Sequence, residues 1–335
     1  MGPVSDAAGN VEVQIRDLDQ TVIGNPAHDI IRLGLSLAMA ARSSDLPGVT
    51  TARMLEAVML GYRRALNKSV GNEKPPDAIA LTFEHALQRK WRHLARERIE
   101  DISPTIPLGK NFWPLMKAER DALDSLFQEE SLRTLLTALD HRDSDSPVRL
   151  LDAAYWVKGC SSLGGLRFVA LAGFGARKKD AVHEDLCLID IKQAGPAAAP
   201  RSADAAMPRD NAERVVAGAR ALSPHLGDRM LAARMLDKSV FVRELLPQDI
   251  KFDMERLSAE EAIGVAQYFA HALGRAHWRQ MENATRQEWA SDLKRANSKQ
   301  LNAPSWLWSS VVDLVARHEM AYLEHCRKYA LATHP

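Results

Sequence analysis

The sequence predicts an α+β protein that is mostly helical and carries a small antiparallel sheet in the middle of the chain. Apolar residues recur at helical spacing through most of residues 26–140 and again from Ser258 onward. Between these blocks, residues 149–245 contain four short β-like segments that are split by turn-forming residues. We therefore expect a helical block, a sheet block with one inserted helix, and a second helical block.

The expected domain boundaries follow from this order. The polar stretch DHRDSDSP at residues 140–147 is rich in turn formers and predicts a linker. Residues 1–142 are expected to form an N-terminal hairpin and a helical lobe, and residues 150–250 a small β-rich lobe with one helix over residues 210–223. Residues 251–335 are expected to be helices that join the helical lobe.

Composition narrows the class of protein. Of 335 residues, 46% are hydrophobic and 26% are charged, which is typical of a soluble globular protein. The net charge near +1 gives no overall field that would attract nucleic acid or a membrane surface, so neither is an expected partner. Three widely separated cysteines, no long apolar run and no signal-peptide pattern predict a cytoplasmic protein. The oligomeric state is not readable.

The opening segment carries the first candidate site. Residues 11–17 alternate between apolar and polar side chains, which predicts a strand with one buried face, paired in a hairpin with the segment around Pro3. Asp17 and Asp19 follow at its end, and Mg²⁺ is commonly held by one or two carboxylates together with substrate phosphates. The alternative is that these are turn residues, as Asn25 would be a helix cap. Spacing alone leaves both interpretations open.

The stretch IRDLDQTVIGNPAHDIIRLGLSLA resembles the segment after the catalytic loop of aminoglycoside and choline kinases. In those proteins a strand ends in Ile-Asp-Phe or Ile-Asp-Trp, and a Gly-Asp-Pro-x-x-Asp step opens a helix. The resemblance implies that Asp17 binds metal and that Asp29 is a structural residue that braces the catalytic loop. Asn25 departs from the pattern, because it stands where those proteins have the first Asp of the step.

Over essentially its full length, the chain resembles the bacterial family called domain of unknown function 2252. The resemblance rests on several motifs that occur in order, namely RDLDQTVIGNPAHD, VKGCSSLGGLRF, LIDIKQA, AERVVAGARAL, VRELLPQDIKF, ALGRAHWRQ and APSWLW. The resemblance to kinases is more distant than this one. The family itself implies no activity.

The kinase resemblance implies a nucleotide-binding lobe in residues 150–250. Such a lobe has a glycine-rich turn over the phosphates, a lysine on its third strand, a helical glutamate that pairs with this lysine, and a hinge strand whose backbone faces the adenine. The corresponding residues are Gly159, Ser161, Ser162, Gly164 and Gly165 in the turn, Lys192, Glu213, and Arg243, Glu244 and Leu245 in the hinge. Taken singly, they are also explained as a plain turn, a strand-edge charge and a surface helix residue. Their order favours the nucleotide lobe.

The order of the parts is permuted relative to ordinary kinases, because Asp17 precedes the small lobe. We therefore expect a circularly permuted, protein-kinase-like fold that binds ATP and Mg²⁺ and transfers a phosphoryl group to an unknown acceptor. An Asp-x-His-x-x-Asn segment, expected just upstream of the strand, does not occur in the sequence. This predicts a chain that is truncated or lacks its catalytic loop. A non-catalytic scaffold or binding protein that retains the fold, and a nucleotidyl transferase, remain the alternatives.

Overall fold

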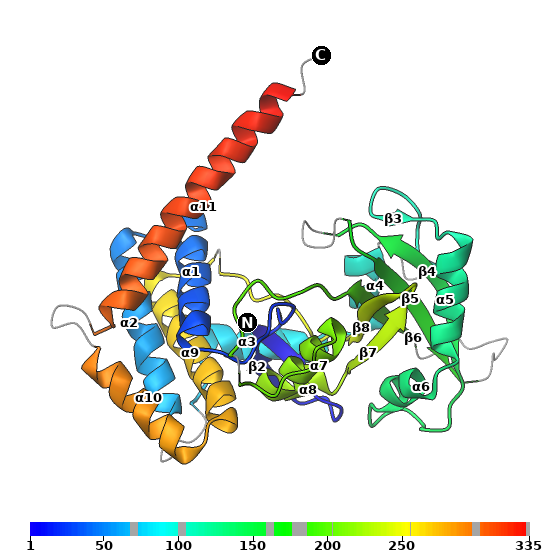
Figure 1. The fold of residues 1–335 in the computed structure, drawn as a ribbon, viewed down its shortest axis with the longest axis horizontal. Helices are drawn as coiled ribbons and strands as arrows, with labels where there is room; N and C mark the ends of the chain where they lie inside the picture. Colours follow the sequence, from blue (N-terminus) through cyan, green and yellow to red (C-terminus); the bar gives the residue numbers. More distant parts are fainter. Residues whose placement is uncertain are drawn as a thin grey trace. The chain divides into compact units, whose positions relative to one another are not determined.

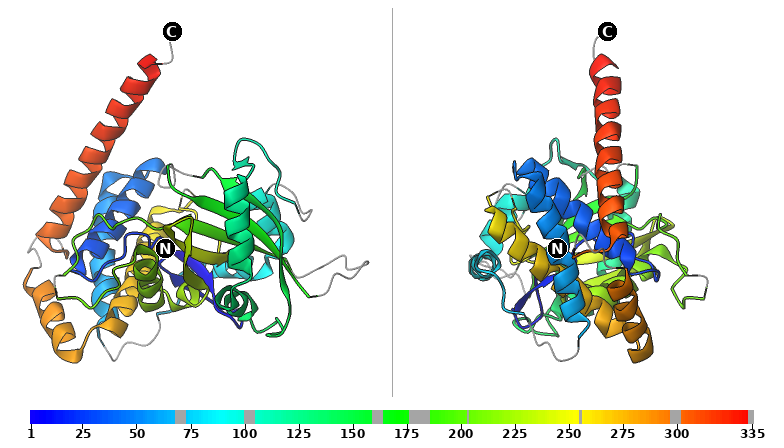
Figure 2. Two further views of the ribbon diagram at one scale, coloured as in Figure 1. Left: turned by 45° about the vertical axis from the view of Figure 1, so that its right-hand side comes forward. Right: turned by 90° about the vertical axis from the view of Figure 1, so that its left-hand side faces the viewer.

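The computed structural model describes residues 1–67, 73–99, 105–158, 164–175, 186–202, 204–254, 256–296 and 302–332 (Figure 1, Figure 2). The chain forms two compact units, and each unit is assembled from two separate segments. Unit 1 comprises residues 1–24 and 82–252 and contains all the described strands. Unit 2 comprises residues 25–81 and 253–335 and is helical.

Unit 1 is built on a six-stranded antiparallel sheet in the order β3-β4-β5-β6-β8-β7 (Figure 1). The strands are β3 (Phe112–Trp113), β4 (Val148–Trp156), β5 (Arg167–Phe174), β6 (Leu186–Gln193), β7 (Met230–Met235) and β8 (Lys238–Leu245). Helix α7 (Asn211–Leu222) and the short α8 (Pro224–Gly227) lie between β6 and β7 in the chain. The predicted sheet and its inserted helix are therefore present, while β3 and β7 were not predicted.

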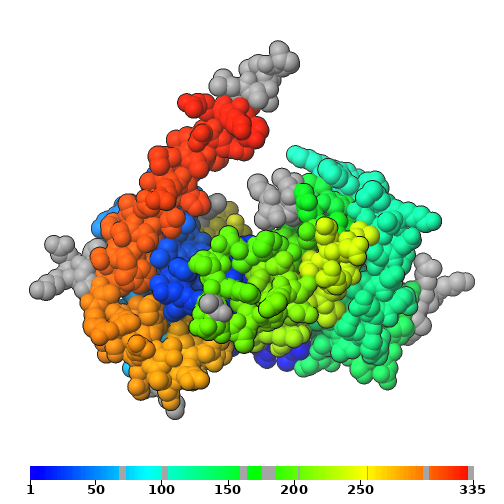
Figure 3. Space-filling view, in the orientation of Figure 1, coloured from blue at the N-terminus to red at the C-terminus, as the bar shows by residue number. Residues whose placement is uncertain are grey.

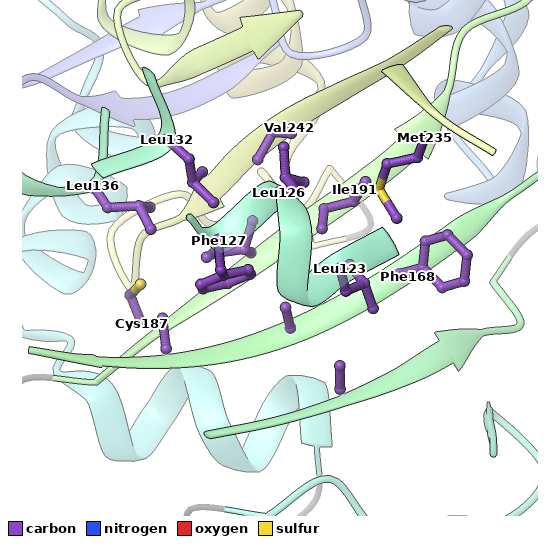
Figure 4. Packing of buried hydrophobic residues seen from close by; sticks show 14 of the residues in the cluster. Leu123, Leu126, Phe127, Leu132, Leu136, Phe168, Cys187, Ile191, Met235 and Val242 are labelled. Atoms are coloured by element: carbon purple, nitrogen blue, oxygen red, sulfur yellow. The ribbon is translucent and has the colours of Figure 1, made fainter. Parts of the chain in front are cut away.

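Strand β6 shows how the sheet divides its side chains between two faces. Because side chains alternate along a strand, Cys187, Ile189 and Ile191 point to one face. There they pack with α5 (Lys117–Phe127) and α6 (Glu130–Thr137) in the buried cluster shown in Figure 4. Leu188, Asp190 and Lys192 point to the opposite face. One face therefore packs an apolar cluster, with the buried Arg142–Glu244 ion pair beside it, and the other carries charge near its centre.

The opposite face of the sheet is covered at two places. Helix α4 (Trp91–Ile99) packs its apolar side on Leu188 and Leu245. Helices α7 and α8 pack on Phe241 in a second cluster, which also includes Val4 and Leu18. Between these clusters lie the charged residues of β6 and β8.

The N-terminal hairpin is present but shorter than predicted. Strand β1 (Gly2–Ser5) pairs with β2 (Val11–Gln14), so the second strand ends three residues before Asp17. The predicted cap is close to its expected place, because Asn25 Oδ1 accepts a hydrogen bond from the backbone of Ala27 at 2.9 Å where α1 (Ala27–Ser43) begins.

Two stretches of the first helical block are each divided into two helices. One stretch forms α3 (Asp77–Gln88) and α4, and the other forms α5 and α6. The first break is stabilised locally, because the backbone N–H of Lys90 donates to His93 Nδ1 at 2.9 Å instead of continuing a helix. The predicted boundary near residue 142 also differs from the observed units, since α4, α5 and α6 bury their apolar sides on the sheet of unit 1.

Unit 2 contains α1, α2 (Gly48–Ala65), α9 (Ala259–Gln280), α10 (Asn283–Arg295) and α11 (Ser305–Ala332). In the part of the chain that the structure describes, none of the helices has the length and apolarity needed to cross a membrane. The far half of α11 extends away from the rest of unit 2 (Figure 3). Met320 and Leu323 on this half are accordingly exposed, and Val312 nearer the start of the helix is exposed as well.

Helices α2 and α9 approach each other most closely at two glycines. A Cβ atom on Gly61 would lie 2.0 Å from the carbonyl oxygen of Gln267, and one on Gly274 would lie 2.7 Å from the Cβ of Ala65. Both distances are shorter than non-bonded atoms allow. The glycines therefore set the spacing of the two helices.

We predict that Gly61→Ala destabilises the protein, because the added methyl group forces the backbones of α2 and α9 apart. Overpacking of this kind costs about 1–3 kcal/mol. The free energy of unfolding, measured in urea by circular dichroism, should fall by an amount in this range.

Gly48→Ala is the matched control. This glycine begins the same helix, and a Cβ atom there would have no neighbour within 4 Å. The control should unfold at the wild-type urea concentration or slightly above it, since alanine is the better helix former. Equal stability of the two variants would contradict the close-contact explanation.

Candidate functional site

Lys192 is the predicted site residue whose surroundings are most informative. It lies on β6, on the charged face of the sheet, and its Nζ forms an ion pair with Asp19 Oδ2. The lysine side chain is 12% exposed and the aspartate side chain 31% exposed, so the pair is accessible from one side. Two residues that were predicted from motifs far apart in the sequence are therefore in direct contact.

Asp19 is held in place by helix α7. Arg214 Nη2 donates to the backbone oxygens of Asp19 at 3.0 Å and Gly195 at 2.8 Å, and its Nη1 donates to that of Thr21 at 2.6 Å. Leu18 is buried in the cluster around α7. The turn that carries Asp19 is therefore fixed at its backbone, which leaves the carboxylate to point at Lys192.

Glu213 does not have the predicted role. It lies on the exposed side of α7, and the carboxylate that meets Lys192 belongs to Asp19. Its neighbour Arg214, which the sequence analysis missed, occupies the buried side of the helix. Gly218, four residues later on α7, was a usable signal. A Cβ atom there would lie 2.3 Å from Thr21 Cγ2, and a glycine within a helix pattern often marks such a close approach.

Asp17 and Asp19 do not follow directly at the end of the strand as predicted. Strand β2 ends at Gln14, Asp17 is exposed, and the buried residue between the two aspartates is Leu18. Among the described residues, no group of three or more His, Cys, Asp or Glu side chains is placed to hold a metal ion. Asp19 is the carboxylate that forms the ion pair with the lysine.

The glycine-rich turn is described only in part. Gly159, Ser161 and Ser162 lie outside the described residues. Gly164 has a positive φ of 79°, and the carbonyl oxygen of Gly165 accepts a hydrogen bond from the Tyr155 hydroxyl at 2.6 Å. The next residue is joined to β6, since the N–H of Leu166 donates to Gln193 Oε1 at 3.0 Å. The end of this turn is therefore fixed beside the residue that follows Lys192.

The expected hinge residues have structural roles in the sheet. Arg243 and Glu244 lie in β8, which is paired with β6 on one side and β7 on the other, and Leu245 is buried in the cluster under α4. Their backbone groups belong to the sheet, so the prediction that they face an adenine is not supported. The Glu244 carboxylate is bound by both terminal nitrogens of Arg142, at 2.7 and 2.9 Å.

Asp29 lies in unit 2, where it takes part in a chain of hydrogen bonds. Its Oδ2 is 3.2 Å from His277 Nε2, and His277 Nδ1 is 2.7 Å from the Tyr62 hydroxyl, which also accepts from Trp289 Nε1 at 3.1 Å. Burial raises the pKa of Tyr62, so its hydroxyl keeps its proton. In the neutral tautomer with its proton on Nε2, His277 accepts from this hydroxyl at Nδ1. His277 then holds a proton on Nε2 and donates it to Asp29. The aspartate therefore connects the start of α1 to α9.

We predict that Glu244 contributes to stability rather than to ligand binding. Removing one partner of a buried ion pair leaves the other charge uncompensated, so Glu244→Leu should lower the free energy of unfolding by about 3–5 kcal/mol. Arg142→Met combined with Glu244→Leu should recover most of this loss, because an apolar pair often replaces a buried ion pair without cost. Urea unfolding of the single and double variants measures both effects.

Glu130→Gln, which breaks the exposed ion pair with Arg133, is the control and should change the unfolding midpoint little. If Glu244→Leu also left the midpoint unchanged, a structural role for Glu244 would be excluded.

Comparison with known proteins gives one match. The model of the family described as "Uncharacterized protein conserved in bacteria (DUF2252)" matches residues 1–328, which is nearly the whole chain. No curated protein and no solved structure gives a match. The match agrees with the family that the sequence motifs indicated. The chain belongs to the DUF2252 family of proteins conserved in bacteria.

Proposed function

We propose that the chain binds ATP and Mg²⁺ in a kinase-like manner and acts as a phosphotransferase on an acceptor whose chemistry is open. The observation that carries the proposal is the ion pair between Lys192 and Asp19. A phosphate-binding lysine and a metal-binding aspartate are two central parts of a kinase site. Lys192 and Asp19, to which we assign these two roles, come from distant segments of unit 1 and meet on one face of the sheet.

The order of the elements supports the same proposal. Strands β4 and β5 flank the glycine-containing segment, β6 carries Lys192, α7 follows, and the hairpin β7–β8 places β8 beside β6. Protein kinases also have a glycine-rich loop, then a strand lysine, then a helix. The aspartate precedes these elements in the chain, which is the permuted order expected from the sequence.

The chemistry of the two side chains fits a nucleotide phosphate with its metal ion. Mg²⁺ is bound by one or two carboxylates together with phosphate oxygens, so Asp19, with the exposed Asp17 two residues away, is a sufficient donor set. The Lys192 ammonium group is a compact positive charge that suits phosphate oxygens. Without a ligand, the two charges neutralise each other. A bound metal–phosphate pair would replace this contact with one between each side chain and a ligand of opposite charge.

Lys192 and Asp19 account for the binding of the phosphates of ATP and of the metal ion, but not for the binding of its adenine. The backbone groups of Arg243 and Glu244, which were expected to contact the base, are paired within the sheet. This observation favours the second candidate function, a binding protein that retains a phosphate-and-metal site without phosphoryl transfer. The two functions differ in whether ATP is consumed, and mass spectrometry of incubated acceptor candidates would detect a transferred phosphoryl or nucleotidyl group.

We predict that ATP with Mg²⁺ raises the thermal unfolding temperature of the wild-type protein and that Lys192→Ala abolishes this increase. A ligand at a hundredfold excess over its dissociation constant stabilises by about 2.7 kcal/mol, which corresponds to a measurable shift. The ligand-induced difference is the relevant quantity, because removing Lys192 also changes the stability of the ligand-free protein. Asp19→Asn should reduce the dependence of the shift on Mg²⁺.

Lys238→Ala is the matched control, because Lys238 is an exposed lysine at the start of β8. It should keep the full ATP-dependent shift. The proposal fails if folded wild-type protein shows no shift at millimolar ATP and Mg²⁺, or if Lys192→Ala and Lys238→Ala respond alike.

A further inference from the structure

A small cavity of about 30 Å³ lies in unit 1 on the charged face of the sheet. It is at Asp190, two residues before Lys192 and therefore about 7 Å from it along the strand. Among the residues that line it are four cationic side chains, Arg16, Arg98, Lys158 and Arg243. These come from the segment after β2, from α4, from the end of β4 and from β8.

The carboxylates near the cavity already have strong partners. Asp190 binds Arg167 through two hydrogen bonds, of 3.0 and 2.8 Å, and Arg243 at 3.0 Å. Asp249 binds Arg229 through two hydrogen bonds, of 3.0 and 2.9 Å. Each carboxylate is therefore neutralised by a buried guanidinium group. Arg98 also pairs with Glu97 at 3.1 Å, and Arg16 donates to the backbone oxygens of Asp249 and Ile250. Among the residues that line the cavity, cationic side chains nevertheless outnumber carboxylates.

Two of the guanidinium groups have donors that are unused by the described residues. The Nε atoms of Arg98 and Arg243 are buried and make no hydrogen bond within the described structure. A buried donor without a partner is destabilising, and more so when the group is charged. Both side chains line the same cavity, so a single acceptor placed there could reach both.

The positive charges also repel one another. Burial, and next the charge of Arg98, lower the pKa of Lys158 to about 8, and burial lowers the pKa of Arg16 to about 10 with a contribution from Arg243. Each cation therefore makes the charged form of its neighbour less favourable. An anion in the cavity would reverse this effect.

We infer that this cavity is a binding site for one small oxyanion of the phosphate class. Arginine side chains bind phosphate through pairs of parallel N–H donors, which matches the unused Nε atoms. The volume suits the closely spaced oxygens of a single phosphate group and is too small for a nucleotide. The inference goes beyond the proposed function, since it requires neither a nucleotide nor a metal ion.

The test measures thermal unfolding against the concentration of inorganic phosphate, with chloride used to hold the ionic strength constant. Wild-type protein should show a saturable rise in unfolding temperature. Arg98→Gln should weaken the apparent phosphate affinity at least tenfold. In phosphate-free buffer this variant should unfold at or above the wild-type temperature, because removing one of several like charges relieves repulsion. That sign separates an anion site from a purely structural arginine, whose loss would destabilise.

Arg96→Gln is the matched control. Arg96 lies on the same helix and is exposed, and the substitution removes the same charge, so the phosphate response should equal that of the wild type.

Arg243→Lys is a second test variant that keeps the positive charge but removes the buried Nε donor, and it should also weaken the phosphate response. Phenyl phosphate separates two kinds of phosphate site. A site for the inorganic ion would not bind phenyl phosphate, whereas a site for the terminal phosphate of a larger molecule would bind it.

The inference is overturned if phosphate has no effect beyond that of chloride, or if Arg98→Gln and Arg96→Gln respond alike. It is also overturned if Lys192→Ala abolishes the phosphate response while Arg98→Gln retains it, because the phosphate would then bind at Lys192. That last result would leave the proposed function standing. If the wild-type protein responded to phosphate but not to ATP with Mg²⁺, the proposed function would fail and the phosphate site would stand.

Discussion

A buried carboxylate in the middle of the sheet, Asp190, fixes the arrangement of the surrounding strands. It projects from β6 and is bound by Arg167 from β5 and Arg243 from β8, the strands on either side. Burial alone would raise the pKa of this group, but the charges of Arg243 and Arg167 hold the pKa below its usual value. A shift of one residue in the pairing would turn this carboxylate toward the apolar cluster on the other face and away from Arg167 and Arg243. The ion pairs of Asp190 therefore specify the register of β6 against β5 and β8. This register also sets the position of Lys192, two residues later on β6.

Much of the fold could be predicted from the sequence, because alternation and turn signals are local. The hairpin at the N-terminus, β6 with Lys192, and α7 with its Asp210 cap all follow from such patterns. The breaks between α3 and α4 and between α5 and α6 could not be predicted from periodicity. The sequence on both sides of each break has an amphipathic helix pattern, so the pattern does not show where one helix ends. The domain boundary was misplaced for a related reason. A helix pattern shows that an apolar side must be buried, but it does not show that a sheet is its partner.

The candidate site was predicted less completely than the fold. Lys192 and Asp19 were both identified as site residues. The predicted partner of Lys192 was nevertheless Glu213, because a helical glutamate was expected to pair with the strand lysine. Whether residue 213 or 214 faces inward depends on the rotation of α7, and adjacent residues on a helix differ by about a quarter turn. The close contact at Gly218 decides this rotation in favour of Arg214. The cationic cavity was not foreseen, because its three arginines and one lysine come from four separate segments and only the fold brings them together.

The two-part construction of each unit has a consequence for how the protein folds as it leaves the ribosome. Unit 1 needs residues from both 1–24 and 82–252, and unit 2 from both 25–81 and 253–335. Helices α1 and α2 are synthesised early, but α9, which packs on them, follows only after residue 258. Most of the chain has therefore emerged before α9 can cover them. The apolar side of α2, with Met54, Val58 and Met59, therefore remains without its partner helix during much of synthesis. Such exposed surface is a substrate for chaperones and a site of misassembly. All residues of unit 1 are synthesised before α9 of unit 2 emerges.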